Sequence, residues 1–200
     1  MKKLALFDID GVIHEGHLIF DIVQDSEKRG IIPFGVWKKI LLEIEEYKSG
    51  RKNYKEAADS MLEAYAKSLS GLSYKDVFNH SYKYISNSKK KMFEYFPKIL
   101  PELKKKYDIS SIAEVMGGNF TGKVGLSLGG NKGIVSELIN KYGREGSIAF
   151  GDSENDADML KEVEYPFVFE ANEKLTKICK ENGWKSVNRG NAYKVLTDLI

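Results

Sequence analysis

The sequence predicts an α/β protein in which an all-helical insert follows the first strand of a doubly wound parallel sheet. Three short apolar runs have the character of buried strands: Leu4–Phe7, Ser147–Phe150 and Phe167–Phe169. A helical pattern precedes the second run, and strand–helix–strand order with short connections favours parallel pairing. Residues from about 14 to 92 show apolar residues at helical spacing and no strand-like alternation.

The helical insert is predicted from apolar residues that recur three or four positions apart. They fall into two series: Val36, Ile40, Ile44 and Tyr47, then Tyr54, Ala58, Met61 and Tyr65. A further helix is expected after Ser73, because Asp76 follows it by three residues as in a capping box. We therefore expect residues 14–92 to form a domain of their own.

The rest of the chain, 1–13 and 93–200, is expected to form the sheet and its covering helices. Pro97 and Pro101 frame a helix that runs through Leu103. Asn131 can cap the helix before the second strand, and Gly143 lies where a helix C-terminus favours glycine.

Composition excludes several classes of protein. The 200 residues carry 31 basic and 29 acidic side chains, and a net charge of +2 argues against a nucleic-acid binder. A single cysteine, Cys179, allows no intramolecular disulfide, and no apolar run reaches the length of a membrane span. A cytoplasmic protein without nucleic-acid or membrane partners is expected.

Carboxylates follow two of the apolar runs directly. Asp8 and Asp10 come after the first, with Gly11 behind them, and Asp152 and Asp156 come after the second. Ligands of α/β sheets bind at the carboxyl ends of strands, so these side chains are expected to gather at one edge. Each motif alone could be a turn or a helix cap. Together they favour a Mg²⁺ site, because hard oxygen ligands suit that cation.

Lys132 is the third candidate, in the glycine-rich stretch Gly129–Gly133. A lysine at a helix start could neutralise phosphate charge, or it could be a surface residue of a turn. The stretch lacks the spacing of a phosphate-binding loop of the Walker type.

In this order, the three motifs resemble the haloacid dehalogenase superfamily of phosphatases, and most closely its phosphoserine-phosphatase-like branch. Gly118–Gly122 is similar to the hairpin before the lysine in that branch, and Phe169–Asn172 to its C-terminal pattern. The resemblance covers residues 1–12 and about 93–190. It implies a Rossmann-like core with a helical cap at 14–92 and the hydrolysis of a small phosphorylated metabolite.

The resemblance also implies a role for each motif residue. Asp8 would be the nucleophile that forms an aspartyl-phosphate, and Asp10 the general acid and base. Asp8, Asp10 (through its carbonyl), Asp152 and Asp156 would hold Mg²⁺. Lys132 would pair with Asp8 and stabilise the charge of the transferring phosphoryl group. Gly11 and Glu15 are candidate substrate-binding residues beside the first motif.

The sequence departs from this family after its second strand. A serine or threonine there should bind a phosphoryl oxygen, and Ser110 and Ser111 are the candidates, although a structural loop role is also open. Only 21 residues separate Ser111 from Lys132, about half of what the family would have. Either a natural deletion or a missing segment near 108–112 would explain the shortening.

The expected substrate is not phosphoserine. Asp59 falls where the resemblance would place an arginine that holds the substrate carboxylate, although Arg51 could replace it. Two other functions stay open: a phosphotransferase that passes the phosphoryl group to an alcohol, and a catalytically silent binding protein of the same fold. Both a monomer and a homodimer fit the sequence.

Overall fold

We describe the chain from a computed structural model, which covers residues 2–87, 91–108, 115–116, 119–120 and 132–199. These residues fall into two compact units. The first holds the described residues of 1–17, 90–111 and 128–200, and the second those of 18–89 and 112–127. The domain limits expected from the sequence stay predictions.

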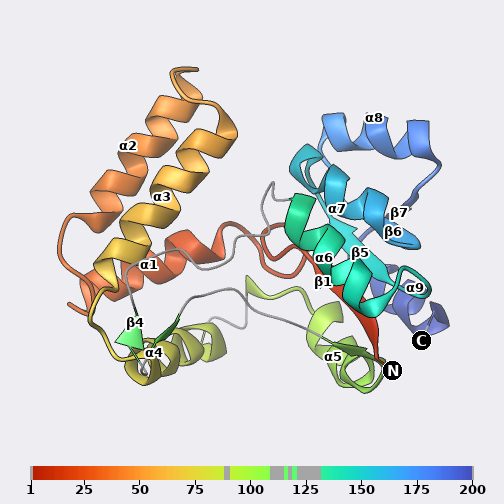
Figure 1. Ribbon diagram of the computed structural model, residues 1–200, viewed down its shortest axis with the longest axis horizontal. Helices are drawn as coiled ribbons and strands as arrows, with labels where there is room; N and C mark the ends of the chain where they lie inside the picture. The colour runs from red at the N-terminus through yellow and green to blue at the C-terminus, as the bar shows by residue number, and fades with distance from the viewer. Residues whose placement is uncertain (1, 88–90, 109–114, 117–118, 121–131, 200) are drawn as a thin grey trace. The chain divides into compact units, whose positions relative to one another are not determined.

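A parallel sheet organises the first unit (Figure 1). Its strand order over the described residues is β2-β1-β5-β6-β7, and every neighbouring pair is parallel. The strands are β1 (Lys3–Phe7), β2 (Tyr107–Asp108), β5 (Ile148–Gly151), β6 (Tyr165–Phe169) and β7 (Lys185–Val187). The three apolar runs of the sequence thus form the central strands β1, β5 and β6, which confirms the predicted α/β fold.

Helices cover both faces of this sheet, so the predicted double winding is confirmed. Helices α5 (Tyr95–Lys106) and α9 (Ala192–Leu199) pack on the face that carries Ala5 and Phe150. Helices α6 (Lys132–Tyr142), α7 (Ala157–Glu162) and α8 (Glu173–Asn182) pack on the face that carries Leu4 and Leu6. Neighbouring residues of β1 point to opposite faces, and both faces are buried, which is why the strand is apolar from Leu4 to Phe7.

Strand β7 is one element that the apolar pattern did not predict. Lys185 and Ser186 are exposed and only Val187 is buried, at 2%. As the edge strand beyond β6, it needs few apolar side chains, so its sequence does not stand out.

The second unit is built mainly from helices: α1 (Leu18–Lys28), α2 (Val36–Lys48), α3 (Tyr54–Ser68) and α4 (Tyr74–Asn87). Their shared core consists of Val23, Ile32, Val36, Ile40, Leu69 and Val77. Asn53 starts α3 with a capping box, in which its side chain accepts from Glu56 N and the Glu56 side chain accepts from Asn53 N. An antiparallel pair, β3 (Val115–Met116) and β4 (Asn119–Phe120), overlaps the hairpin expected near 118–122.

The chain leaves and re-enters the first unit along two adjacent backbone segments. Glu15 N donates to Lys91 O at 2.7 Å, and Phe93 N donates to Ile13 O at 2.9 Å. Just beyond this pair, the buried hydroxyl of Tyr95 donates to Val12 O at 2.6 Å. The start of α5 is therefore joined to the loop that follows β1.

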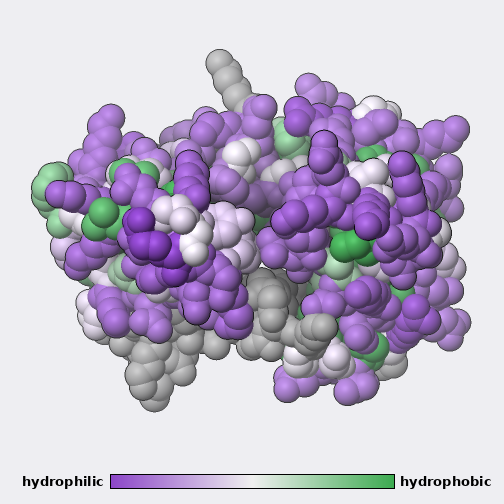
Figure 2. Space-filling view, turned by 90° about the horizontal axis from the view of Figure 1, so that it is seen from above, coloured by the Kyte–Doolittle hydropathy of each residue, from purple (hydrophilic) through white to green (hydrophobic). Residues whose placement is uncertain are grey.

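The surface is predominantly hydrophilic in the view of Figure 2, and its hydrophobic residues form small separate patches. Within the described part of the chain, every helix is too short or too polar to cross a membrane.

Candidate active site

Asp8 directly follows the last residue of β1. One further backbone hydrogen bond to β5 extends the strand pairing as far as this residue. Its N–H donates to Phe150 O at 2.9 Å, so the backbone position is fixed by the sheet. The Asp8 side chain accepts from the N–H of Ile9 at 2.8 Å through Oδ1. A carboxylate held in this way has its second oxygen available for other partners.

Asp152 and Asp156 come from the loop after the neighbouring strand, β5. The loop includes a short 3₁₀ turn, η2 (Glu154–Asp156). Asp156 Oδ2 accepts from the N–H groups of Asp152 and Ser153, both at 3.0 Å, and from Ser153 Oγ at 3.2 Å. The Asp156 carboxylate therefore stabilises the loop that carries Asp152.

Two glycines make room for these carboxylates. A Cβ on Gly11 would lie 2.0 Å from Asp152 Oδ2, and one on Gly151 would lie 2.4 Å from Asp156 Cβ. Gly11 also has a φ of +76°, a conformation that other residues rarely adopt. The loop after β1 can therefore approach Asp152 closely only with glycine at position 11, and the Asp156 side chain can lie against the end of β5 only with glycine at position 151.

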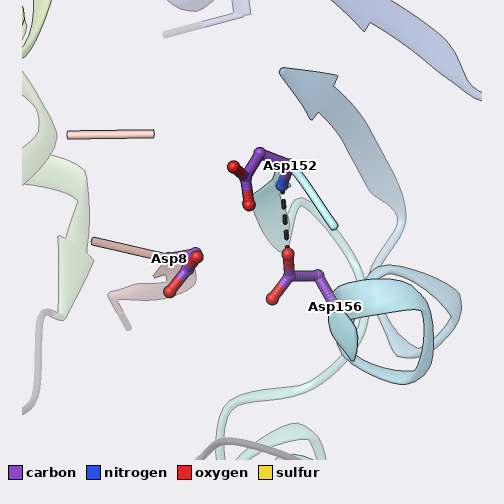
Figure 3. Close-up of side chains that lie close together, drawn as sticks. All are labelled: Asp8, Asp152 and Asp156. Atoms are coloured by element: carbon purple, nitrogen blue, oxygen red, sulfur yellow. Dashed lines mark hydrogen bonds between the residues drawn. The ribbon is translucent and has the colours of Figure 1, made fainter. Parts of the chain in front are cut away.

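The three carboxylates form one cluster (Figure 3). One oxygen of each of Asp8, Asp152 and Asp156 lies within 4.8 Å of the others. In Figure 3 the carboxylates of Asp152 and Asp156 point toward Asp8. Three hard oxygen donors gathered around one point suit Mg²⁺, and no other group of this kind is found among the described residues.

Burial and mutual repulsion raise the pKa values of the cluster. Burial is the main cause for Asp8, and the charges of Asp156 and Asp152 add to it, so that its pKa rises to about 8. The pKa of Asp152 rises to about 6, mainly through burial and then through Asp156. Burial also raises the pKa of Asp156, although its hydrogen bonds from Ser153 and Asp152 oppose this. The negative charge of the three carboxylates is therefore stabilised either by the binding of protons or by the binding of a cation.

We expect these shifts to make the EDTA-treated protein less stable as the pH rises. Each pKa is higher in the folded state than in the unfolded chain, so its stabilising contribution is complete below about pH 4 and is lost as the pH approaches 8. With solvent screening taken into account, we expect the free energy of unfolding to fall by roughly 2–4 kcal/mol over this pH range. Urea unfolding between about pH 5 and pH 8 should show this loss in EDTA and a smaller one in Mg²⁺. If the free energy of unfolding depended on pH equally in EDTA and in Mg²⁺, the carboxylate cluster would not be the metal site.

Asp10 lies in the same loop as Asp8, and a histidine contacts it. His17 Nδ1 lies 3.1 Å from Asp10 Oδ2. This hydrogen bond is the main cause that raises the pKa of His17 above its usual value. The pair brings a titratable base next to the residue that the resemblance makes the general acid.

The other expected site residues are described only in part. Lys132 is the first residue of α6, but its side chain lies outside the described atoms. Ser110 and Ser111 also lie outside the described residues. Glu15 is exposed, and its N–H donates to Lys91 O. Gly11 lies beside the Asp152 carboxylate, in the space that a Cβ would need.

Other residues around the site did not stand out in the sequence. His14 is only 4% exposed, and neither ring nitrogen has a hydrogen-bond partner within the described residues. Glu154 and Asn172 hydrogen-bond to each other at 2.7 Å beside the Asp152 loop. They are 18 residues apart, so only the fold reveals the contact.

Comparison of the fold with solved structures gives several matches of low sequence identity. A protein of unknown function from Bordetella pertussis Tohama I has a TM-score of 0.69 and 17% identity, and the match covers 94% of this chain and 99% of that one. A HAD family hydrolase from Salmonella enterica serovar Typhi has a TM-score of 0.59 and 15% identity, and the match covers 92% of this chain and 66% of that one. A probable phosphoserine phosphatase from Vibrio cholerae has a TM-score of 0.53 and 16% identity, and the match covers 100% of this chain and 67% of that one. At these identities the similarity concerns the fold.

Sequence comparison identifies the family. Among curated proteins no significant match was found. The family model for haloacid dehalogenase-like hydrolases matches residues 22–192, well over half of the chain. The matched region includes Asp152 and Asp156 and begins after Asp8 and Asp10, which the fold brings to the same sheet edge. This chain belongs to the haloacid dehalogenase-like hydrolase family.

Proposed function

We propose that this protein is a Mg²⁺-dependent phosphomonoester hydrolase that acts on a small phosphorylated metabolite through an aspartyl-phosphate. The observation that carries the proposal is the cluster of Asp8, Asp152 and Asp156, whose oxygens lie within 4.8 Å of one another. A structural role does not explain three like charges at this spacing, because their repulsion opposes folding. The phosphoryl chemistry of the family does explain it.

The donor set of the site fits Mg²⁺. Asp8, Asp152 and Asp156 would hold it, together with the carbonyl of Asp10. Bound there, the cation would neutralise the cluster, keep Asp8 ionised and screen it from the phosphate.

The reaction then needs two steps from the chain's own residues. In the first, an Asp8 oxygen attacks phosphorus, the bond to the leaving oxygen breaks, and Asp10 gives that oxygen a proton. In the second, Asp10 takes a proton from water, the water oxygen attacks phosphorus, and the Asp8–phosphorus bond breaks to release phosphate. Lys132 would stabilise the negative charge on the phosphoryl oxygens in both steps.

We further propose that the helical unit acts as the cap of this enzyme and sets its substrate. Asp59 of α3 forms an ion pair with Lys55 at 2.6 Å, and Arg51 makes two hydrogen bonds to Glu46. Arg51 is thus engaged with a carboxylate of its own chain, which supports the expectation that phosphoserine is not the preferred substrate. Turnover of phosphoserine above that of simple alcohol or sugar phosphates would overturn this.

Hydrolysis of p-nitrophenyl phosphate tests the proposed function. We expect turnover with Mg²⁺, none in EDTA, and full recovery when Mg²⁺ is added back. Adding an alcohol acceptor separates the two reaction types, because a transferase would form a new phosphate ester at the expense of free phosphate. If the folded protein turns over neither this substrate nor a panel of phosphorylated metabolites with Mg²⁺, the proposal is wrong and a silent binding protein is favoured.

A further inference from the structure

Hydrogen bonds join the loop of Asp152 and Asp156 to the loop that precedes α8. Asn172 N donates to Asp152 O at 3.1 Å. The side-chain Nδ2 of Asn172 donates to Glu154 Oε2 at 2.7 Å. Glu154 lies between the two aspartates in sequence, so this contact holds the middle of their loop.

Asn172 also begins α8. Its Oδ1 accepts from Leu175 N at 2.9 Å, which makes it the N-cap of the helix. The amide therefore uses its oxygen for the helix and its nitrogen for Glu154. Aspartate would provide only the first of these contacts and lysine only the second, because an amide is both acceptor and donor. The hydrogen bond to Leu175 N also fixes which end of the amide is the oxygen.

Glu154 has a second partner in Lys174, whose Nζ lies 2.9 Å from Oε1. The Lys174 side chain is 77% exposed, so this ion pair adds little to the free energy of folding. The bond from Asn172 is different, because Asn172 is itself fixed at the helix start.

These contacts matter because the loop carries two like charges toward a third. When Asp8, Asp152 and Asp156 are all ionised, their repulsion favours separation of the loop from β1. Asp156 Oδ2 bonds to the loop backbone, so movement of that backbone would also move the Asp156 carboxylate. A tether to α8 opposes such movement before any cation binds.

We propose that Asn172 and Glu154 are positioning residues that hold the 152–156 loop with its aspartates toward Asp8, so that the divalent cation binds without reordering the loop. This inference rests on the proposed function. Residues that orient metal ligands without binding the metal affect metal affinity by about 10–100-fold. The expected signature is a change in the Mg²⁺ requirement with little change in turnover at saturating Mg²⁺.

The test measures p-nitrophenyl phosphate hydrolysis against Mg²⁺ concentration. Asn172→Ser keeps an oxygen that can cap α8 but is too short to reach Glu154. We expect it to raise the half-saturating Mg²⁺ concentration about 10-fold and to leave kcat at saturation within about twofold. Lys174→Met is the matched control, which removes the exposed ion pair and should change neither value by more than about twofold.

Two variants of Glu154 separate the hydrogen bond from the charge. Glu154→Gln keeps an acceptor for Asn172, whereas Glu154→Ala does not. We expect the alanine variant to match Asn172→Ser, the glutamine variant to lie nearer wild type, and Asn172→Ser/Glu154→Ala to be no worse than the single variants. Equal effects of Gln and Ala would mean that only the charge matters, and the inference would be wrong.

The remaining outcomes are also decisive. An unchanged Mg²⁺ requirement in folded Asn172→Ser would overturn the inference, and so would a loss confined to kcat. If Asn172→Ser does not fold, the two Glu154 variants decide alone. A wild type that binds Mg²⁺ by calorimetry but hydrolyses nothing would refute the proposed function instead, and the same variants would then be compared by their Mg²⁺ dissociation constants.

Discussion

Replacing Asp8 with asparagine is expected to abolish hydrolysis and, in EDTA, to make the protein more stable. An amide cannot form the acyl phosphate, so kcat should fall by roughly 10⁴ or more. The same change removes the charge whose burial raises the pKa of Asp8 to about 8. At pH 8 the folded wild type must hold a buried carboxylate that its neighbours repel, whereas the unfolded chain exposes it freely, and asparagine has no such cost.

The measurement pairs a phosphatase assay in Mg²⁺ with thermal unfolding in EDTA at pH 8. We expect Tm in EDTA to rise by several degrees for Asp8→Asn and the advantage to shrink when Mg²⁺ is added. Asp158→Asn in α7 is the control, because that carboxylate pairs with Lys161 at 3.9 Å outside the cluster. If Asp8→Asn retains activity, Asp8 is not the nucleophile. If it is inactive but less stable in EDTA, the cluster does not oppose folding.

Gly11→Ala is expected to separate the two loops of the site. The new Cβ would lie 2.0 Å from Asp152 Oδ2 and 2.7 Å from its Cγ, so the Asp152 carboxylate must move. The φ of +76° adds a strain of about 1 kcal/mol. We expect a loss of stability of about 1–3 kcal/mol, a Mg²⁺ affinity lower by roughly 10–100-fold, and a kcat/KM that falls at least as far.

Gly16→Ala is a matched control for this prediction. Gly16 has nearly the same φ, +79°, but no described atom lies within 4 Å of where its Cβ would be. This variant should lose about 1 kcal/mol of stability and keep its Mg²⁺ affinity and activity. Mg²⁺ titration by calorimetry and urea unfolding of both variants provide the comparison. Equal behaviour of the two would show that backbone strain, and not the contact with Asp152, explains the effect at Gly11.

The parts of the fold that sequence could predict are those with local signals. The strands β1, β5 and β6 are buried on both faces, so each appears as a short apolar run. Asp8 and Asp152 were recognisable because each follows such a run, and parallel strands end at the same edge. β7 was not predicted, because Lys185 and Ser186 at the sheet edge carry no apolar signal.

The contacts that complete the site depend on loop conformations that local patterns do not encode. Asp10 meets His17 because the segment between β1 and α1 folds back on itself, and Glu154 meets Asn172 because the loops after β5 and β6 lie against each other. His14 is buried for a similar reason, since the entering segment pairs with the returning one at Met92. The serine expected after the second strand, Ser110 or Ser111, stays a prediction.

The paired backbone segments at residues 13–15 and 91–93 have an evolutionary consequence. The chain leaves and returns through neighbouring hydrogen bonds, so the two ends of the intervening sequence lie side by side. Its attachment to the sheet is therefore as local as that of a short turn. Lineages can lengthen, shorten or exchange such a segment without shifting the register of β1 against β5. With the helical unit in its proposed role as the cap, selection for a new substrate can therefore act on the inserted helices while the aspartates at the strand ends remain unchanged.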